Sequence, residues 1–138
     1  MLWVNVRIGF EVNKRKRVIV SEINKLNNSF EVVKREFFPR WDSRNNWVVK
    51  KDIKLDSRGW CERSIKTIKI RSIPYNQNSL YWFLIHEICH AVSTDSHGRR
   101  WGHRMLKASK SAQKKGNGEL SGMILNDLEK LNRFGKEK

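Results

Sequence analysis

The segment His86-Glu87-Ile88-Cys89-His90 contains the side chains with the clearest capacity for chemistry in this sequence. Residues four apart on an α-helix lie on one face, about one turn apart, so both imidazoles can reach a single ion. A glutamate inside such an HExxH pattern stays off the metal and acts as the general base toward zinc-bound water. We therefore predict that His86 and His90 are zinc ligands and that Glu87 is the catalytic base of a hydrolase.

A catalytic zinc ion needs a third protein ligand and keeps its fourth position for water or substrate. The candidates for this ligand are His97, His103, Asp95 and Glu119. His97 follows His90 after a run of turn-forming residues, so the chain can fold back onto the same ion. A continuous helix after His97 would aim His103 away from that ion. We predict His97 as the third ligand of one zinc ion.

Three helices are expected in the second half of the chain. The apolar stretch around the HExxH pattern predicts a helix that runs to about Val92, with Asn78 or Ser79 as its N-cap. A second helix is expected over about 98–114 and a third over about 119–134, separated by a glycine-rich turn.

The first half of the chain has a different pattern. Residues 2–10 alternate weakly and predict a strand, and residues 17–28 predict an amphipathic helix that ends at an asparagine pair. From Ser29 to Arg71, runs rich in Val, Ile, Phe and Trp are separated by turn signals and predict three antiparallel strands. The expected fold class is α+β, with an antiparallel sheet of about three to four strands packed on the HExxH helix and two to three further helices.

Length, charge and cysteine content narrow the class of protein. The 138 residues are about one domain long, so we expect a single domain over 1–138. The net charge of +15 attracts polyanions, and we favour nucleic acid over an anionic membrane as the partner. Cys61 and Cys89 cannot build a disulfide framework, and the order of the N-terminal residues does not fit a secretory signal. We expect an intracellular protein of the cytoplasm or nucleoid that is not secreted, has no membrane partner and is a monomer by default.

Positive charge is concentrated around the predicted metal site. Between Arg63 and Gly118 the only acidic residues are Glu87 and Asp95. On the helix expected after His97, cations recur at spacings of three and four and form a face suited to phosphates. The predicted nucleic-acid contacts are Arg99, Arg100, Arg104 and Lys107. Three tryptophans among nearby arginines are open to two interpretations, base stacking or packing against the core: Trp41, Trp47 and Trp60.

The segment HEICHAVSTDSHGRRW resembles the SprT-like metallopeptidases, whose pattern is HE-x-[LIC]-x-H-A, a loop, and then H-G-x-x-[FW]. The resemblance implies a zincin-like fold with zinc ligands His86, His90 and His97 and with Glu87 as the base. The loop before the HG pair is short for that family and closer to the WLM and YgjP-like groups, and a C-terminal cysteine-rich zinc ribbon is missing. The matching residues are His86, Glu87, His90, Ala91, His97, Gly98 and Trp101.

Eukaryotic members of that family cleave proteins crosslinked to DNA. The resemblance therefore implies a zinc metalloendopeptidase that acts on DNA-associated proteins, with a role in DNA repair. Two alternatives stay open from the residues themselves. One is a basic nucleic-acid-binding protein with a structural or vestigial zinc site, and the other is a zinc hydrolase of small phosphorylated substrates.

Overall fold

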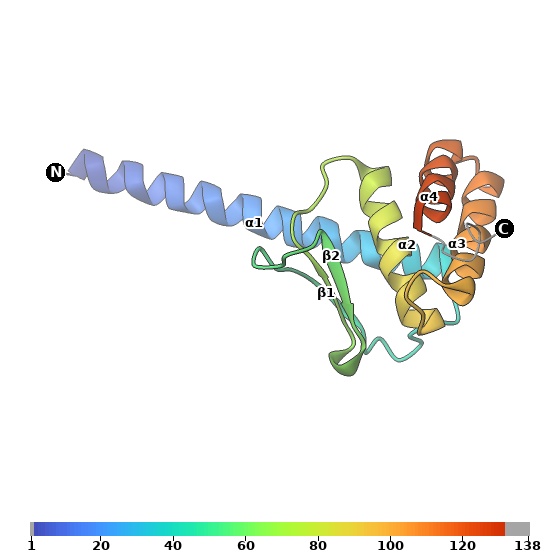
Figure 1. Ribbon diagram of the computed structural model, residues 1–138. Helices are drawn as coiled ribbons and strands as arrows, with labels where there is room; N and C mark the ends of the chain where they lie inside the picture. The colour runs from blue at the N-terminus through green and yellow to red at the C-terminus, as the bar shows by residue number, and fades with distance from the viewer. Residues whose placement is uncertain (1, 132–138) are drawn as a thin grey trace.

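Four α-helices and a three-stranded sheet make up residues 2–131, the part of the chain that the computed structural model describes (Figure 1). Side chains are described from residue 14 onward. The arrangement is of the α+β class, as the sequence predicts. In chain order the elements are α1 (Leu2–Phe37), β1 (Val48–Lys51), β2 (Gly59–Glu62), the short 3-10 helix η1 (Arg63–Ile65), β3 (Thr67–Ile70), α2 (Gln77–Ser93), α3 (Arg99–Lys114) and α4 (Gly118–Leu131).

The long helix α1 replaces two of the predicted strands. The strand expected over 2–10 and the first of the three expected after Ser29 are both wrong, because α1 continues through each of them. Leu26, Phe30 and Val33 are buried at helical spacing, and this stripe runs across the asparagine pair that was expected to end the helix. Burial of the stripe outweighs the few tenths of a kcal/mol that each asparagine costs inside a helix.

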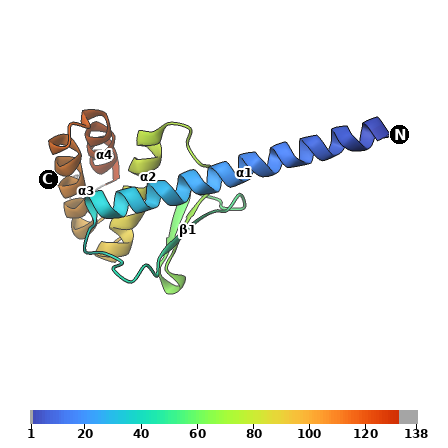
Figure 2. The same ribbon diagram turned by 180° about the vertical axis from the view of Figure 1, so that it is seen from behind.

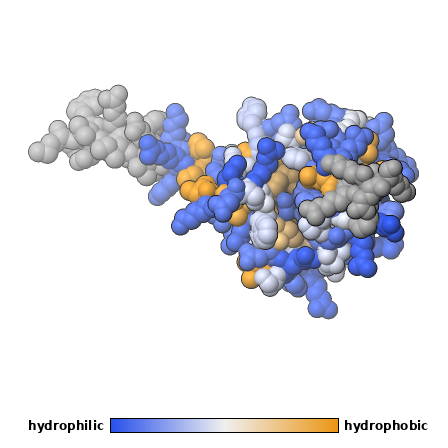
Figure 3. Space-filling model, viewed as in Figure 1, coloured by the Kyte–Doolittle hydropathy of each residue, from blue (hydrophilic) through white to orange (hydrophobic). Residues whose placement is uncertain are grey.

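The C-terminal part of α1 packs against the rest of the molecule. It contacts α2 and β1, whereas the N-terminal part extends beyond the other elements (Figures 1 and 2). Apolar surface is visible on this extension in Figure 3, and the exposed aliphatic side chains there are Val18, Ile19, Val20 and Ile23. None of the helices within residues 2–131 combines the length and the apolar character needed to cross a bilayer.

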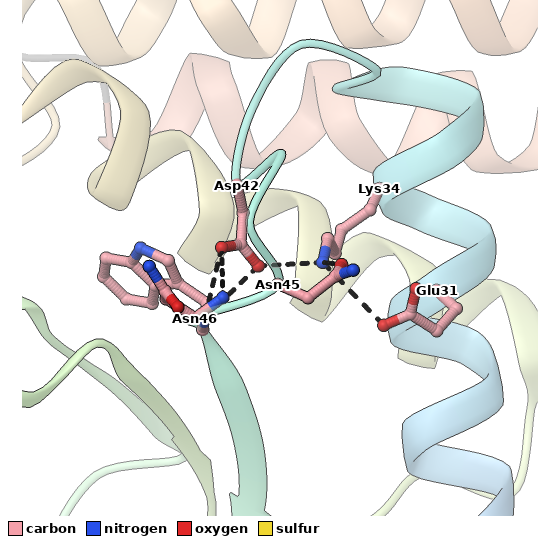
Figure 4. Close-up of polar contacts among 6 residues, drawn as sticks. Glu31, Lys34, Asp42, Asn45 and Asn46 are labelled. Carbon is pink, nitrogen blue, oxygen red and sulfur yellow. Dashed lines mark hydrogen bonds and ion pairs between the residues drawn. The ribbon is translucent and has the colours of Figure 1, made fainter.

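A buried ion pair between Lys34 and Asp42 stabilises the loop that follows α1 (Figure 4). Lys34 Nζ lies 2.8 Å from Asp42 Oδ2, and the two side chains are only 8% and 2% exposed. Asp42 also accepts a hydrogen bond from the backbone N–H of Asn46 at 2.7 Å, and the Asn45 side chain accepts one from Lys34 at 3.0 Å. Because both buried charges have further hydrogen-bond partners, the pair holds the turn that directs the chain into β1.

The sheet is mixed, with strand order β1-β3-β2. β2 pairs with β3 in antiparallel fashion, but β1 is parallel to β3, so the prediction of a purely antiparallel sheet is wrong. The chain reverses once between β1 and β2 and again at η1, which gives β3 the direction of β1. β3 contains the buried Ile68 and Ile70 and takes the centre. β2 is therefore left at an edge of the sheet.

The helices of the second half match their predicted positions. α2 has Asn76 as its N-cap, whose side chain accepts from the backbone N–H of Ser79 at 3.1 Å, so the predicted caps lay two or three residues too late. The last helix was predicted to end at about Phe134, which lies outside the described residues. Side chains from these three helices form much of the core, among them Leu84, Ile88, Trp101, Met105, Leu120 and Ile124.

Candidate metal centre

The three predicted histidines lie together where α2 ends and α3 begins. His86 Nε2 is 3.2 Å from His90 Nε2 and 3.3 Å from His97 Nε2, and the potential ligand atoms of all three lie within 4.8 Å of one another. In a tetrahedral zinc site with bonds of 2.0–2.1 Å, neighbouring ligand nitrogens are about 3.3 Å apart. The two distances from His86 therefore match those of a site for one tetrahedral ion.

Hydrogen bonds at the other ring nitrogen determine what His86 and His90 present to each other. His86 Nδ1 lies 2.6 Å from Asp127 Oδ2, and His90 Nδ1 lies 2.7 Å from the carbonyl oxygen of Asp95. Both partners are acceptors, so each Nδ1 donates, and the neutral ring then has its lone pair on Nε2. Burial lowers the pKa of His90 to about 4, which keeps this ring neutral at pH 7. Two lone pairs 3.2 Å apart repel unless a cation or a shared proton lies between them.

Asp127, which was not predicted from the sequence, is the hydrogen-bond partner of His86 Nδ1. Asp127 is on α4 and only 7% exposed, and its Oδ2 also accepts a hydrogen bond from Trp82 Nε1 at 2.9 Å. A carboxylate in this position orients a metal-binding histidine and raises its basicity. The signal in the sequence is that Asp127 shares a helical stripe with the buried Leu120 and Ile124, where an acidic residue is unusual.

A tight turn between α2 and α3 brings His97 back to the cluster. Thr94 and His97 have φ angles of 54° and 62°, in the left-handed region that costs a non-glycine residue about 1–2 kcal/mol. The Asp95 carboxylate accepts hydrogen bonds from the backbone N–H groups of Arg100 at 3.1 Å and Trp101 at 3.2 Å. The start of α3 is thereby capped, and the cap holds the strained turn in place.

Gly98 and Trp101 explain the spacing that follows His97. A Cβ atom at position 98 would lie 2.5 Å from Asp95 Oδ2, so only glycine leaves room for the capping carboxylate. The Trp101 ring is fully buried under the cluster, stacked on the His90 ring at a centroid distance of 5.7 Å and edge-to-face with the His97 ring at 4.7 Å. Its Nε1 donates to the carbonyl oxygen of His86 at 3.3 Å. The tryptophan thus forms the floor on which the imidazoles rest.

Glu87 lies in the cleft into which the cluster opens. The cleft has a volume of about 330 Å³. The Glu87 residue is 6% exposed, and burial raises its pKa to about 7, with His86 lowering the value and Asp127 raising it. The HExxH helix therefore places a carboxyl group and two imidazoles in one cavity, as its spacing predicts.

The edge strand β2 forms the opposite wall of this cleft. A Cβ atom at Gly59 would lie 2.0 Å from the Phe83 ring and 3.2 Å from Glu87 Oε1, so β2 and α2 are in close contact there. Burial raises the pKa of Cys61 to about 12, with a further increase from Glu87, so this thiol is protonated at neutral pH. The residues of this wall are Ser57, Gly59, Trp60, Cys61 and Arg63.

The other candidates for a third ligand do not join the histidine cluster. Asp95 serves as the cap of α3, while His103 and Glu119 are exposed on α3 and α4. Cys89 is fully buried in the core, where it packs as a small apolar side chain.

The predicted nucleic-acid contacts and the three tryptophans fall in different places. Trp41 and Trp47 pack against the core with ring centroids 5.3 Å apart, whereas Trp60 is 57% exposed and lines the metal cleft. All four predicted cations are exposed on α3: Arg99, Arg100, Arg104 and Lys107.

Comparisons with family models, with curated proteins and with solved structures found no match to this chain. The chemistry of the site therefore has to be inferred from its own geometry. Imidazoles that converge on one point suit a transition metal, and a carboxyl group in the same cleft is a proton acceptor.

Proposed function

We propose that this chain is a zinc-dependent metallopeptidase of the SprT-like type that acts on DNA-associated proteins. The observation that carries the proposal is the distance of 3.2 Å between the Nε2 atoms of His86 and His90. Each of these two rings is hydrogen-bonded through its Nδ1 atom, so the two Nε2 atoms are free to bind an ion. With His97 the set has three imidazoles, and three protein ligands with an open fourth position are typical of catalytic zinc.

The residues of the cleft have separate roles in the proposed reaction. Zinc, when bound, supplies a Lewis acid that activates water and polarises a carbonyl group. Glu87 accepts a proton from the attacking water and passes it to the leaving amine. Arg63 lines the same cleft and supplies positive charge near the carbonyl oxygen as negative charge develops there. Asp127 acts through His86, which it holds in the tautomer with a free Nε2.

The position of β2 supports a peptide as the substrate. β2 pairs with β3 on one side and has no strand on its other side among the described residues. An extended peptide can add to such an edge through main-chain hydrogen bonds. The peptide would then lie along the free edge of β2, in the cleft that Glu87 and the histidines line. A small phosphorylated substrate would make no use of this edge.

The surface of α3 supports nucleic acid as a partner. The helix contains no Asp or Glu, and Arg104 and Lys107 are exposed with no ion pair among the described residues. Together with Arg40 they line a groove of about 660 Å³ that also contains the aromatic side chains of Phe37 and Trp41. Cations for phosphates next to aromatic faces for bases are the combination that binds single strands.

The proposal is tested by digestion of a DNA-binding protein with the zinc-loaded chain, with and without single-stranded DNA, at two salt concentrations. We expect cleavage by the wild type and the His103→Ala control, and loss of cleavage with retained zinc for Glu87→Gln. Salt should weaken stimulation by DNA steeply, because phosphate contacts release counterions. An unchanged rate of proteolysis in Glu87→Gln would refute the assigned base.

A nucleic-acid-binding protein with a structural zinc site is the second candidate, favoured by the acid-free α3. Such a protein would bind single-stranded DNA and cleave no protein, and Glu87→Gln would leave its activity in cells unchanged. Hydrolysis of nucleotides without proteolysis would instead favour the third candidate, a hydrolase of small phosphorylated substrates.

A further inference from the structure

A second cleft of about 410 Å³ begins one helical turn from the metal ligands. Its walls come from the chain just before β2, from the end of β3 and the loop after it, from the first half of α2 and from α4. Trp82 lines this cleft and lies four residues before His86, so the two side chains share one face of α2, with ring centroids 6.2 Å apart. Trp82 and His86 also share the Asp127 carboxylate. The second cleft is therefore adjacent to the metal cleft and linked to it.

Two arginines give the second cleft its charge. Arg58 and Arg71 both line it, both are exposed, and neither forms an ion pair among the described residues. The Arg58 guanidinium lies over the Trp82 ring, 5.9 Å from its centroid. Arg71 donates through its side chain to the carbonyl oxygen of Asp56 at 3.4 Å, an uncharged acceptor that leaves its positive charge in place. No Asp or Glu is among the described residues that line the cleft.

The register of the sheet places the two cations side by side. Gly59 pairs with Ile70, and the backbone N–H of Arg71 donates to the carbonyl oxygen of Arg58 at 3.0 Å, which continues the β2–β3 ladder by one residue. Side chains opposite each other in such a ladder lie on the same face, with Cβ atoms about 5 Å apart, and like charges there are destabilising. A bound anion would remove this repulsion. The remaining walls are largely apolar and suit the stem of a peptide side chain: Ile70, Pro74, Phe83 and Met123.

The direction of β2 decides which part of a bound peptide reaches this cleft. Arg58 lies next to Trp82, and the following residue, Gly59, lies next to Phe83 and Glu87. Further along, Arg63 lines the metal cleft near the end of α2, so β2 and α2 run in the same direction. A peptide that adds antiparallel to β2 would pass the metal cleft first and Arg58 afterwards. Because a strand rises about 3.3 Å per residue, the cleft lies within about two residues of the reacting bond.

We propose that the second cleft is a subsite for a carboxylate on the C-terminal side of the bond that is cleaved, with Arg58 and Arg71 as the specificity-determining residues. The carboxylate belongs to an Asp or Glu side chain or to the free C-terminus of the peptide, since a pair of guanidinium groups binds either one. This inference rests on the proposed peptidase function.

Quenched fluorescent peptides that differ only in this region test the subsite with the full zinc-loaded chain. Three arms separate the sources of the carboxylate: Glu with an amidated C-terminus, Gln with a free C-terminus, and Gln with an amidated C-terminus. We expect kcat/KM to be at least about tenfold higher for a carboxylate arm than for the uncharged arm, as for a charged hydrogen bond. Arg58→Gln and Arg71→Gln should reduce this ratio toward one, and Arg44→Gln, in an exposed loop, should leave it unchanged.

Binding of the same peptides to the zinc-loaded Glu87→Gln variant separates failure of the subsite from failure of the peptidase. A preference for the carboxylate peptides in binding, abolished by Arg58→Gln, would support the subsite even if the wild type cleaves none of the peptides. In that case the absence of cleavage would count against the peptidase function alone. Equal kcat/KM and equal affinity for all three arms would overturn the subsite, whether or not the peptides are cleaved. Zinc content and thermal unfolding verify that each variant is folded.

Discussion

Replacement of Asp127 by asparagine tests how the surroundings of His86 contribute to metal binding. The Asp127 carboxylate accepts hydrogen bonds from His86 Nδ1 at 2.6 Å and from Trp82 Nε1 at 2.9 Å through the same oxygen. Asparagine keeps the shape and one acceptor oxygen but removes the charge that makes these hydrogen bonds strong. Loss of such a partner typically weakens metal binding roughly 10- to 100-fold, or about 1.4–2.7 kcal/mol.

The assay is competition for zinc between the metal-free chain and a chromophoric chelator. Glu129→Gln is the matched control, because it makes the same chemical change at an exposed position of the same helix, and we expect its zinc affinity to stay within about twofold of the wild type. Circular dichroism verifies that both variants are folded. If Asp127→Asn binds zinc as tightly as the wild type, Asp127 does not support a metal ligand and the assignment of His86 loses its main structural argument.

Three further predictions follow from the same contacts. Gly98→Ala should weaken zinc binding, because the new Cβ would lie 2.5 Å from Asp95 Oδ2 and displace the turn that holds His97. Gly122→Ala is the control: its Cβ would have no atom within 4 Å, so it should instead raise the free energy of unfolding by about 0.5–1 kcal/mol in denaturant titrations. Asp42→Ala removes the close, buried partner of Lys34 and leaves this buried charge with only the long 3.8 Å ion pair to the exposed Glu31. It should lower the free energy of unfolding by about 3–5 kcal/mol, against about 0–1 kcal/mol for Glu62→Ala, which breaks the more exposed pair with Lys69. In the metal-free chain, Glu87 binds its proton more tightly when folded, so its contribution to stability should fall by up to about 3 kcal/mol as the pH rises from 4.5 to 7. His90, with its pKa lowered to about 4, contributes in the opposite sense between pH 4 and 6.5. This contribution is common to the wild type and Glu87→Gln, so the difference between their thermal stabilities isolates Glu87. The stability of Glu87→Gln relative to the wild type should rise from pH 4.5 to 7, and a constant difference would count against the prediction.

The candidate site was largely predictable from the sequence because local spacing determines much of it. Helical geometry alone places His86, Glu87 and His90 along one helix, and the apolar residues around them predict that helix within a few residues. The turn-forming residues between His90 and His97 similarly predict the return of His97. Asp127 was not predictable in the same way, because its contact with His86 joins residues 41 positions apart.

The errors in the first half of the chain have a common physical cause. Residues such as Val32, Val33 and Phe37 favour strands by type, but their helical spacing lets one face of α1 pack against α2 and β1. The parallel pairing of β1 with β3 depends on which strand takes the centre of the sheet, and short apolar runs do not specify that order. Tertiary packing therefore decided both features.

The most direct test of the account is the zinc content and the coordination of the zinc ion in the purified chain, measured by metal analysis and X-ray absorption. We predict one zinc ion per chain with three imidazole nitrogens at about 2.0–2.1 Å, and the fourth position taken by an oxygen ligand such as water. His103→Ala should preserve this signal, while His97→Ala should lose a nitrogen ligand and most of the zinc affinity. A chain that binds no zinc, or one in which His97→Ala leaves the coordination unchanged, would contradict the central claim.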